Sequence, residues 1–131
     1  MKTIIVCDAI HPVGFELLKK EQDINVIDAV NTPKDELLKI LGEADVAITR
    51  SSTEVNEAFL EAGKKLKAIV RAGVGVDNVD IDGCSRRGII AMNVPTANTI
   101  AAVELTMAHM LAAARSLEYA HNDLKLDRIW K

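Results

Sequence analysis

Aromatic residues are scarce in this chain, since Phe, Trp and Tyr make up 3% of its 131 residues. Its core must therefore be built from aliphatic side chains, and a content of 49% hydrophobic and 27% charged residues is typical of globular domains. An excess of basic residues is also missing, because the formal net charge is −3. We expect neither a nucleic-acid nor a membrane-surface partner, since both require a basic face.

Cysteine is equally rare. Cys7 and Cys84 are not spaced as CxxC, so neither a disulfide framework nor a metal site is expected, and their apolar neighbours predict buried free thiols. No apolar run reaches the roughly 18 residues of a membrane span. The first residues turn polar too soon for a signal peptide. The sequence therefore predicts a cytoplasmic protein.

Short apolar runs rich in β-branched residues recur at even spacing. They predict five strands, at residues 3–7, 25–29, 46–49, 68–70 and 89–92. Because their apolar residues are continuous rather than alternating, we expect each strand to be buried on both faces.

The segments between these strands have the composition of amphipathic helices. Pro12 suits the first turn of one helix. Residues 32–35 resemble a capping box that opens a second helix, with Gly42 as its end. A third helix is expected over residues 56–63, and Asp80 caps a fourth that ends at Gly88.

Strands that alternate with helices predict a parallel sheet. We expect an α/β domain over residues 1–98, with a flavodoxin-like five-stranded parallel sheet and helices on both faces. Ligands bind such sheets at the carboxyl edge of the strands.

Residues 99–131 follow a different pattern. Residues 99–115 predict a helix that is apolar on nearly every side, as expected of a helix placed between two partners. A more polar helix or loop follows over residues 117–131. The chain then stops at Lys131 without a helix terminator, which suggests an engineered or proteolytic end.

The most informative segment is residues 67–80, which read K-A-I-V-R-A-G-V-G-V-D-N-V-D. It predicts a strand, a glycine turn and a capped helix start. Gly73 and Gly75 allow the backbone to approach a ligand, and outward amides there can hold a carboxylate or phosphate. A GxGxxG dinucleotide fingerprint is excluded, because Asn78 replaces its third glycine and Asn93 stands where a ribose-binding acid is expected.

Three segments, in order, are similar to motifs of the D-2-hydroxyacid dehydrogenases. Residues 71–80 resemble the R-A-G-x-G-x-D-N-V-D motif of that family, and residues 50–53 (R-S-S-T) resemble its R-S-x-T motif. Residues 92–105 resemble the entry into its interdomain helix, with Val103 where many members have Ala. The resemblance extends from about residue 46 to the end of the chain.

This resemblance implies the substrate-side half of a two-domain, NAD-dependent oxidoreductase that lacks its nucleotide-binding domain. Hydride passes in such enzymes between C2 of the acid and the nicotinamide. Val74 is expected near the nicotinamide, and no catalytic residue is expected in this chain. The residues implied in substrate binding are Arg50, Ser51, Arg71, Ala72, Gly73, Val74 and Gly75.

Arg50 and Arg71 end neighbouring predicted strands, so both are expected to reach one ligand. Two cationic forks suit a substrate with a second anion, such as a phosphate. We therefore expect the phosphoglycerate dehydrogenase branch of the family, which oxidises 3-phospho-D-glycerate to 3-phosphohydroxypyruvate in serine biosynthesis. The alternatives are an Arg50 that pairs with a surface carboxylate and glycines that merely turn the chain. Glu104 is expected to form hydrogen bonds at an interface rather than to belong to the site.

None of the histidines is expected to be catalytic. His11 is expected at a solvated helix start, His109 on the apolar helix and His121 in the polar tail. Because the family's catalytic His belongs to the missing half, the isolated chain is expected to be inactive.

Two other classes were weighed. A phosphoacceptor receiver domain is disfavoured because the third and fifth strands end at Arg50 and Asn93 rather than at Asp and Lys, and residues 8–12 are not a flavin phosphate loop. A stand-alone acid-binding or dimerisation module without catalysis stays open. The apolar helix predicts a homodimer formed through residues 99–131.

Overall fold

The computed structural model describes residues 1–126. Its elements are β1 (Lys2–Val6), α1 (Pro12–Lys20), β2 (Ile24–Asp28), α2 (Lys34–Leu41), β3 (Val46–Thr49), α3 (Glu57–Ala62), β4 (Ala68–Arg71), α4 (Ile81–Arg86), β5 (Ile90–Asn93), α5 (Thr99–Ala114) and α6 (Leu117–Lys125). The chain divides into two compact units, Met1–Pro95 and a second that begins at Thr96.

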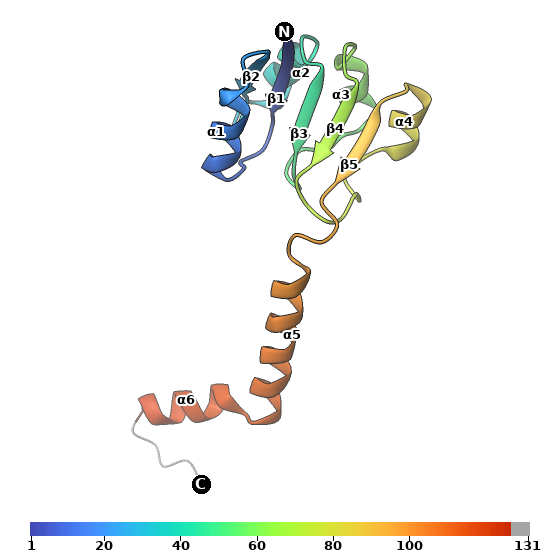
Figure 1. The fold of residues 1–131 in the computed structure, drawn as a ribbon. Coiled ribbons are helices and arrows are strands. Elements are labelled where there is room, and N and C mark those ends of the chain that lie inside the picture. Colours follow the sequence, from blue (N-terminus) through green and yellow to red (C-terminus); the bar gives the residue numbers. More distant parts are fainter. Residues whose placement is uncertain (127–131) are drawn as a thin grey trace. The chain divides into compact units, whose positions relative to one another are not determined.

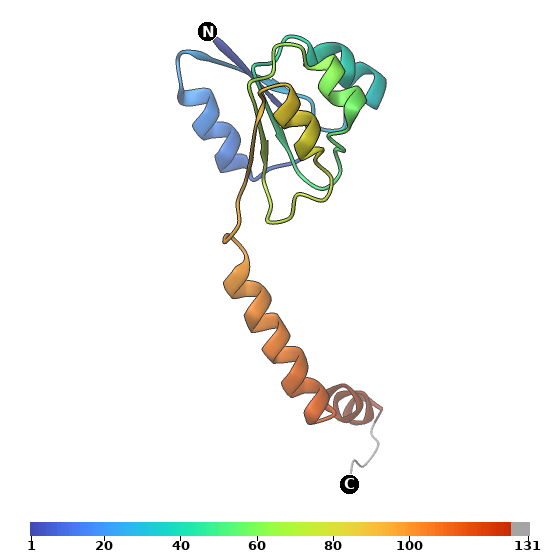
Figure 2. The same ribbon diagram turned by 90° about the vertical axis from the view of Figure 1, so that its right-hand side faces the viewer.

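The first unit contains a five-stranded sheet of order β2-β1-β3-β4-β5, in which every pairing is parallel (Figure 1). Figure 2 shows α1 on one face of this sheet and α2, α3 and α4 on the other. The α/β fold expected from the sequence, with a parallel sheet and a following apolar helix, is confirmed.

The main core lies between the sheet and the helices α2, α3 and α4. Ile5, Ala47 and Ile69 project into it from three adjacent strands, and each is at most 1% exposed. Leu41 and Phe59 close the core from α2 and α3. Cys7 and Cys84 are buried free thiols, as their apolar neighbours predict.

The expectation that every strand is buried on both faces is wrong for β2 and β5. No residue of β2 is buried, and all four residues of β5 are exposed, with Ile90 at 62% and Met92 at 46%. Both strands lie at the edges of the sheet. In the first unit, one face also carries α1 as its only helix, and α1 packs beside β2. Continuous apolar sequence therefore overstates burial at an edge.

The polar residues that begin three helices behave as expected. The side chain of Asn56 accepts a hydrogen bond from the Phe59 amide, and that of Asp80 accepts one from the Gly83 amide. His11 caps α1 through Nδ1, which accepts from the Val13 amide at 3.3 Å. Each uses a side-chain acceptor to satisfy an amide of the first helical turn.

The capping box expected at residues 32–35 is wrong. Pro33 occupies the N-cap position of α2, and no side chain caps this helix. Thr32 instead closes a turn in which its amide donates to the Ala29 carbonyl at 3.1 Å, and Asn31 adopts a left-handed φ of 64°. With Pro33 between Thr32 and the helix, the Thr32 side chain stands one residue too early to cap it. Gly42 follows the last residue of α2, as expected.

The second unit consists of α5 and α6. Most large apolar side chains of α5 are exposed, including Ile100 at 71% and Met110 and Leu111 at 62% each. The polar segment expected over residues 117–131 forms α6 as far as Lys125, and residues 127–131 lie outside the described residues. Within residues 1–126, no single helix has the length and apolar character of a membrane span; only α5 and α6 together, across a 66° bend, pass on length and composition.

Candidate functional site

Two loops follow neighbouring strands at the carboxyl edge of the sheet. Residues 50–55 form the arginine loop after β3, and residues 72–79 form the glycine loop after β4. The register that pairs Thr49 with Arg71 places the two loops side by side. The Ala72 amide continues this pairing by donating to the Thr49 carbonyl at 2.8 Å.

A carboxylate from β1 holds the arginine loop. Asp8 is only 8% exposed and follows the end of β1. Its Oδ2 accepts from the backbone amides of Arg50 and Thr53, and its Oδ1 accepts from the Thr53 hydroxyl at 2.9 Å. Asp8 therefore shapes the loop that carries Arg50 and Ser51, and three loop donors satisfy its buried charge.

The side chain of Asn78 joins the two loops. Its Nδ2 donates to the carbonyls of Arg50 and Thr53, both at 2.6 Å, and its Oδ1 accepts from Nε of Arg71 at 2.8 Å. The Asn78 carbonyl accepts from the Val55 amide at 2.9 Å. Asn78 thus contacts both loops with its side chain and its backbone.

The glycine loop presents free backbone donors. Within the described residues, the amides of Val74 and Gly75 donate to no protein group, and both residues are exposed. Their neighbour Gly73 differs, because its amide donates to the Arg71 carbonyl at 2.8 Å. Asn93 holds the Val74 carbonyl through Nδ2 at 2.7 Å. Two of the three expected amides are therefore free to meet a ligand.

Gly73 leaves room for the side chain of Arg71. A Cβ on Gly73 would lie 2.5 Å from Nη1 of Arg71, well inside a van der Waals contact. The Arg71 guanidinium thus lies against the glycine loop, and its side chain is only 11% exposed. The sequence predicts that Gly73 lets a ligand approach the backbone. In the structure, the missing side chain of Gly73 instead makes space for Arg71.

The two expected cationic forks differ in the structure. Arg50 is exposed, and its Nη1 donates to the Ala9 carbonyl at 3.0 Å, which leaves its other donors available. Arg71 is occupied by Asn78, and its Nη2 lies 3.9 Å from Oδ1 of Asp77. Each guanidinium donates one hydrogen bond within the protein, but Arg71 is 11% exposed and Arg50 is exposed, so Arg50 is the more accessible of the two. Binding of one ligand by both arginines stays a prediction.

Ser51 and Ala72 occupy the expected positions. Ser51 is exposed in the arginine loop, and Ala72 is half-buried at the start of the glycine loop. Their contact with a ligand stays a prediction. Glu104, which we assigned to an interface, is an exposed residue of α5.

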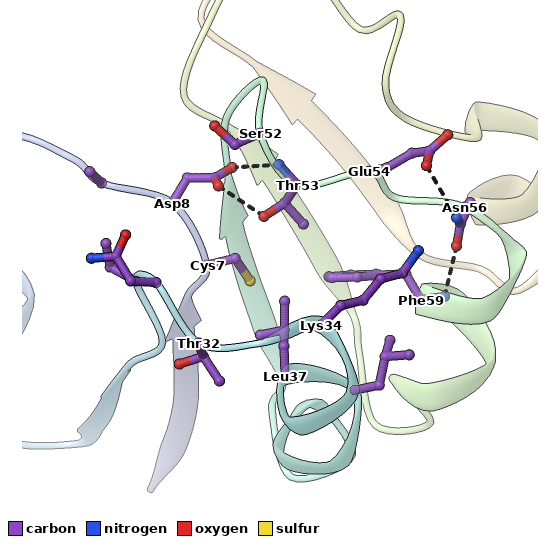
Figure 3. A pocket seen from close by; sticks show the side chains of 14 residues that line it. Cys7, Asp8, Thr32, Lys34, Leu37, Ser52, Thr53, Glu54, Asn56 and Phe59 are labelled. Carbon is purple, nitrogen blue, oxygen red and sulfur yellow. Dashed lines mark hydrogen bonds between the residues drawn. The ribbon is translucent and has the colours of Figure 1, made fainter.

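A cavity of about 430 Å³ adjoins the arginine loop on the side of α2 and α3 (Figure 3). Leu37 and Phe59 form apolar walls, and Thr32, Lys34 and Ser52 line its polar part. The buried Cys7 thiol also lines it. Burial, with the negative charge of Asp8, raises the pKa of that thiol to about 12, so it is not a nucleophile at neutral pH.

Sequence reasoning missed Asp8 and Asn78 as members of the site. Asn78 entered the sequence analysis as part of the family motif and as a departure from a nucleotide fingerprint, and Asp8 only within residues 8–12, which are not a flavin phosphate loop. The available signal was positional, since a polar residue directly after a parallel strand lies at the edge where ligands bind. Which donors it would meet depends on loop geometry, which the sequence does not display.

Chemically, this edge can bind an anion. An exposed guanidinium in one loop and backbone amides without a protein acceptor in the neighbouring loop are the kinds of donor that hold a carboxylate or phosphate. Of the three histidines, His11 caps α1 and the other two lie on α5 and α6. The described residues therefore provide binding groups but no assembled base for proton transfer.

Residues 4–125 match the family model described as the D-isomer specific 2-hydroxyacid dehydrogenase, catalytic domain. A D-3-phosphoglycerate dehydrogenase of Methanocaldococcus jannaschii is 42% identical over 125 residues, which are 95% of this chain and 24% of that protein. A hydroxypyruvate reductase of Thermotoga maritima is 40% identical over 92% of this chain and 39% of that protein. The chain thus spans about a quarter of the length of the first of these relatives.

Solved structures give the same result. A protein of Thermus thermophilus superposes with a TM-score of 0.82 at 28% identity, over 98% of this chain and 42% of that one. The NAD⁺-bound 3-phosphoglycerate dehydrogenase of Entamoeba histolytica gives a TM-score of 0.69 at 30% identity, over 85% of this chain and 38% of that one.

Proposed function

The chain belongs to the D-isomer specific 2-hydroxyacid dehydrogenase family, and from that premise we propose that it forms the substrate-binding part of an NAD-dependent phosphoglycerate dehydrogenase. The proposed reaction oxidises C2 of 3-phospho-D-glycerate to the ketone of 3-phosphohydroxypyruvate. This reaction would serve serine biosynthesis in the cytoplasm.

The observation that carries the proposal is that one edge of the sheet carries an exposed arginine and, in the neighbouring loop, backbone amides without a protein acceptor. Arg50 is exposed, and the Val74 and Gly75 amides have no protein acceptor within residues 1–126. We assign the substrate carboxylate to these amides and its phosphate to Arg50, because a guanidinium binds a phosphate through two parallel hydrogen bonds. Ser51 follows Arg50 in the arginine loop, and its hydroxyl is a further donor for the substrate.

The residues of the glycine loop fit a nicotinamide ring. Val74 has a side chain that is 41% exposed and an amide without a protein acceptor in the described chain, so it offers an apolar contact and a polar one. NAD, when bound, would supply the hydride acceptor. The glycine loop cannot serve as the dinucleotide fingerprint, because residues 72–80 separate β4 from α4 and no helix begins at the glycines.

Two substrates compete in this proposal. Curated relatives named D-3-phosphoglycerate dehydrogenase, at 40–42% identity, favour phosphoglycerate. The Thermotoga maritima relative, named hydroxypyruvate reductase, is 40% identical and favours an acid without the phosphate. Since Arg50 is the more exposed of the two arginines at this edge, phosphate selectivity should depend on it.

The second unit is assigned to association between copies. The exposed apolar side chains of α5 would be covered by a homodimer formed through residues 99–131, of which 127–131 lie outside the described residues. Light scattering should therefore give the mass of two chains, and Met110→Asp should give one. A monomer at high concentration would oppose this assignment.

The proposed function is tested by assaying the complete gene product for NAD reduction with 3-phospho-D-glycerate, D-glycerate and D-lactate. The expected result is a preference for the phosphorylated acid, which Arg50→Gln abolishes. Equal or better turnover of D-glycerate would favour the hydroxypyruvate reductase alternative. The chain Met1–Lys131 alone is expected to show no turnover, because the resemblance assigns the catalytic His to the nucleotide-binding half.

A further inference from the structure

Asn78 makes a set of contacts that no other described residue makes. Among residues 1–126, the side-chain hydrogen bonds that join the arginine loop to the glycine loop all come from Asn78. A second link is made by the backbone, through the parallel bridge between Val55 and Val79. The orientation of the Asn78 amide follows from chemistry: a flip would set its oxygen against two carbonyls and its NH₂ against a guanidinium.

Asn78 also determines where the Arg71 side chain lies. Its Oδ1 accepts from Nε of Arg71 at 2.8 Å, and this bond keeps the guanidinium beneath Gly73. The glycine loop therefore packs against the Arg71 side chain, which Asn78 holds in place. The Asn78 side chain also donates a hydrogen bond to the Arg50 carbonyl. One side chain thus supports both parts of the anion site.

We propose that Asn78 is a positioning residue that sets the distance between Arg50 and the free amides of Val74 and Gly75. It has no contact with the substrate in this assignment. It fixes the two loops relative to each other, so that a single acid contacts both the guanidinium and the amides. The inference rests on the proposed function, which it deepens by naming what organises the site.

Position 78 requires an asparagine because its side chain must both donate and accept hydrogen bonds. Asp at position 78 would keep the volume and the pairing with Arg71, but it would lose both donors and set a carboxylate oxygen against the carbonyls of Arg50 and Thr53. Asn78→Asp therefore separates the link between the loops from the support of Arg71. Asn56→Ala is the control, because Asn56 caps α3 and contacts neither Arg50 nor the glycine loop.

The first measurement uses the complete gene product. Asn78→Asp should raise KM for 3-phospho-D-glycerate about tenfold or more, which corresponds to the loss of about one good hydrogen bond, with a smaller change in kcat. Asn56→Ala should leave KM within about twofold of the wild-type value, even if it lowers Tm as much as Asn78→Asp does, because a helix cap acts on stability. An unchanged KM in Asn78→Asp, or an equal rise in Asn56→Ala, would overturn the proposal.

The second measurement needs no substrate. Hydrogen exchange of the chain should speed up about tenfold in Asn78→Asp at two amides of the arginine loop: that of Val55, which donates to the Asn78 carbonyl, and that of Thr53, which donates to Asp8. The Phe59 amide of α3 should be unaffected. Unchanged exchange at Thr53 and Val55 would refute the link. If the wild-type gene product fails to oxidise phosphoglycerate, the proposed function fails, and this comparison still decides the role of Asn78.

Discussion

The side chain of Asp8, at the end of β1, accepts hydrogen bonds from both the amide and the hydroxyl of Thr53, at 3.1 and 2.9 Å. The two residues lie far apart in the sequence and meet because β1 and β3 are neighbours in the sheet. Through this pair, the first strand of the domain shapes the loop that presents Arg50. The anion site is thus organised by strands β1, β3 and β4 together.

Removing the Asp8 carboxylate should destabilise the chain. Asp8→Ala leaves the donors of Arg50 and Thr53 without their buried acceptor, at an expected cost of about 3 kcal/mol in the free energy of unfolding. Chemical denaturation measures this cost. Asp28→Ala is the matched control, because exposed Asp28 accepts only from the Val30 amide and should cost less than about 1 kcal/mol. Equal losses in the two variants would contradict the role given to Asp8.

At the amino end of the strands, the contacts of Asp45 should make the stability of the chain sensitive to acid. The Thr3 amide and the Lys2 ammonium hold the pKa of Asp45 at about 2, below its ordinary value of 3.8. Because the folded pKa is the lower one, this stabilisation is present above about pH 4 and is lost as the pH falls toward 2. Asp45→Asn should flatten the unfolding free energy over that interval. Glu21→Gln should not, since the Glu21 side chain has no partner in the described chain, and identical pH profiles would refute the assignment.

The Cys7 thiol should be inert in the folded chain. Its pKa is raised to about 12 from the ordinary value of 9.0, so the neutral thiol contributes stability below about pH 9, and this contribution is lost as the pH rises toward 12. In a Cys84→Ser background, a thiol reagent at pH 8 should label Cys7 on the order of a hundredfold more slowly in the native chain than in urea. Equal rates would show that Cys7 is accessible.

Gly73→Ala should disturb the site through Arg71. The new Cβ would displace the guanidinium and break its bond to Asn78, at an expected cost of about 1 kcal/mol. Gly42→Ala is the control, because its Cβ would meet its nearest atom, the Ala62 carbonyl oxygen, at an ordinary 3.5 Å. Thermal unfolding of both variants gives the comparison, and a Gly73→Ala variant as stable as Gly42→Ala would contradict this packing.

Much of the fold can be predicted from the sequence because its signals are local. The strand runs, the helix expected over residues 56–63 and the cap at Asp80 depend on residues close together in the chain, and the structure confirms them. Burial of β2 and β5 was predicted wrongly, since whether a strand lies at an edge depends on the sheet order. The cap at Thr32 failed because the proline after it takes the N-cap position.

The candidate site, too, was predicted only in part from the sequence. The motifs located the two loops, and the strand register places them side by side. The direction of the Arg71 side chain depends on Asn78 and on the space that Gly73 leaves for it, which only the folded loop defines. Long-range partners such as Asp8 and Thr53 lie beyond what residue spacing can indicate.

We propose that Arg50 and the amides of Val74 and Gly75 bind one phosphorylated acid. NMR tests this binding by following the amide resonances of the chain while 3-phospho-D-glycerate is added, with Arg50→Gln as the control. We expect the largest saturable shifts at Val74 and Gly75, and weaker binding in Arg50→Gln. Saturable shifts confined to the cavity between α2 and α3, or shifts at the glycine loop that are unaffected by Arg50→Gln, would show that the anion does not bind at these residues.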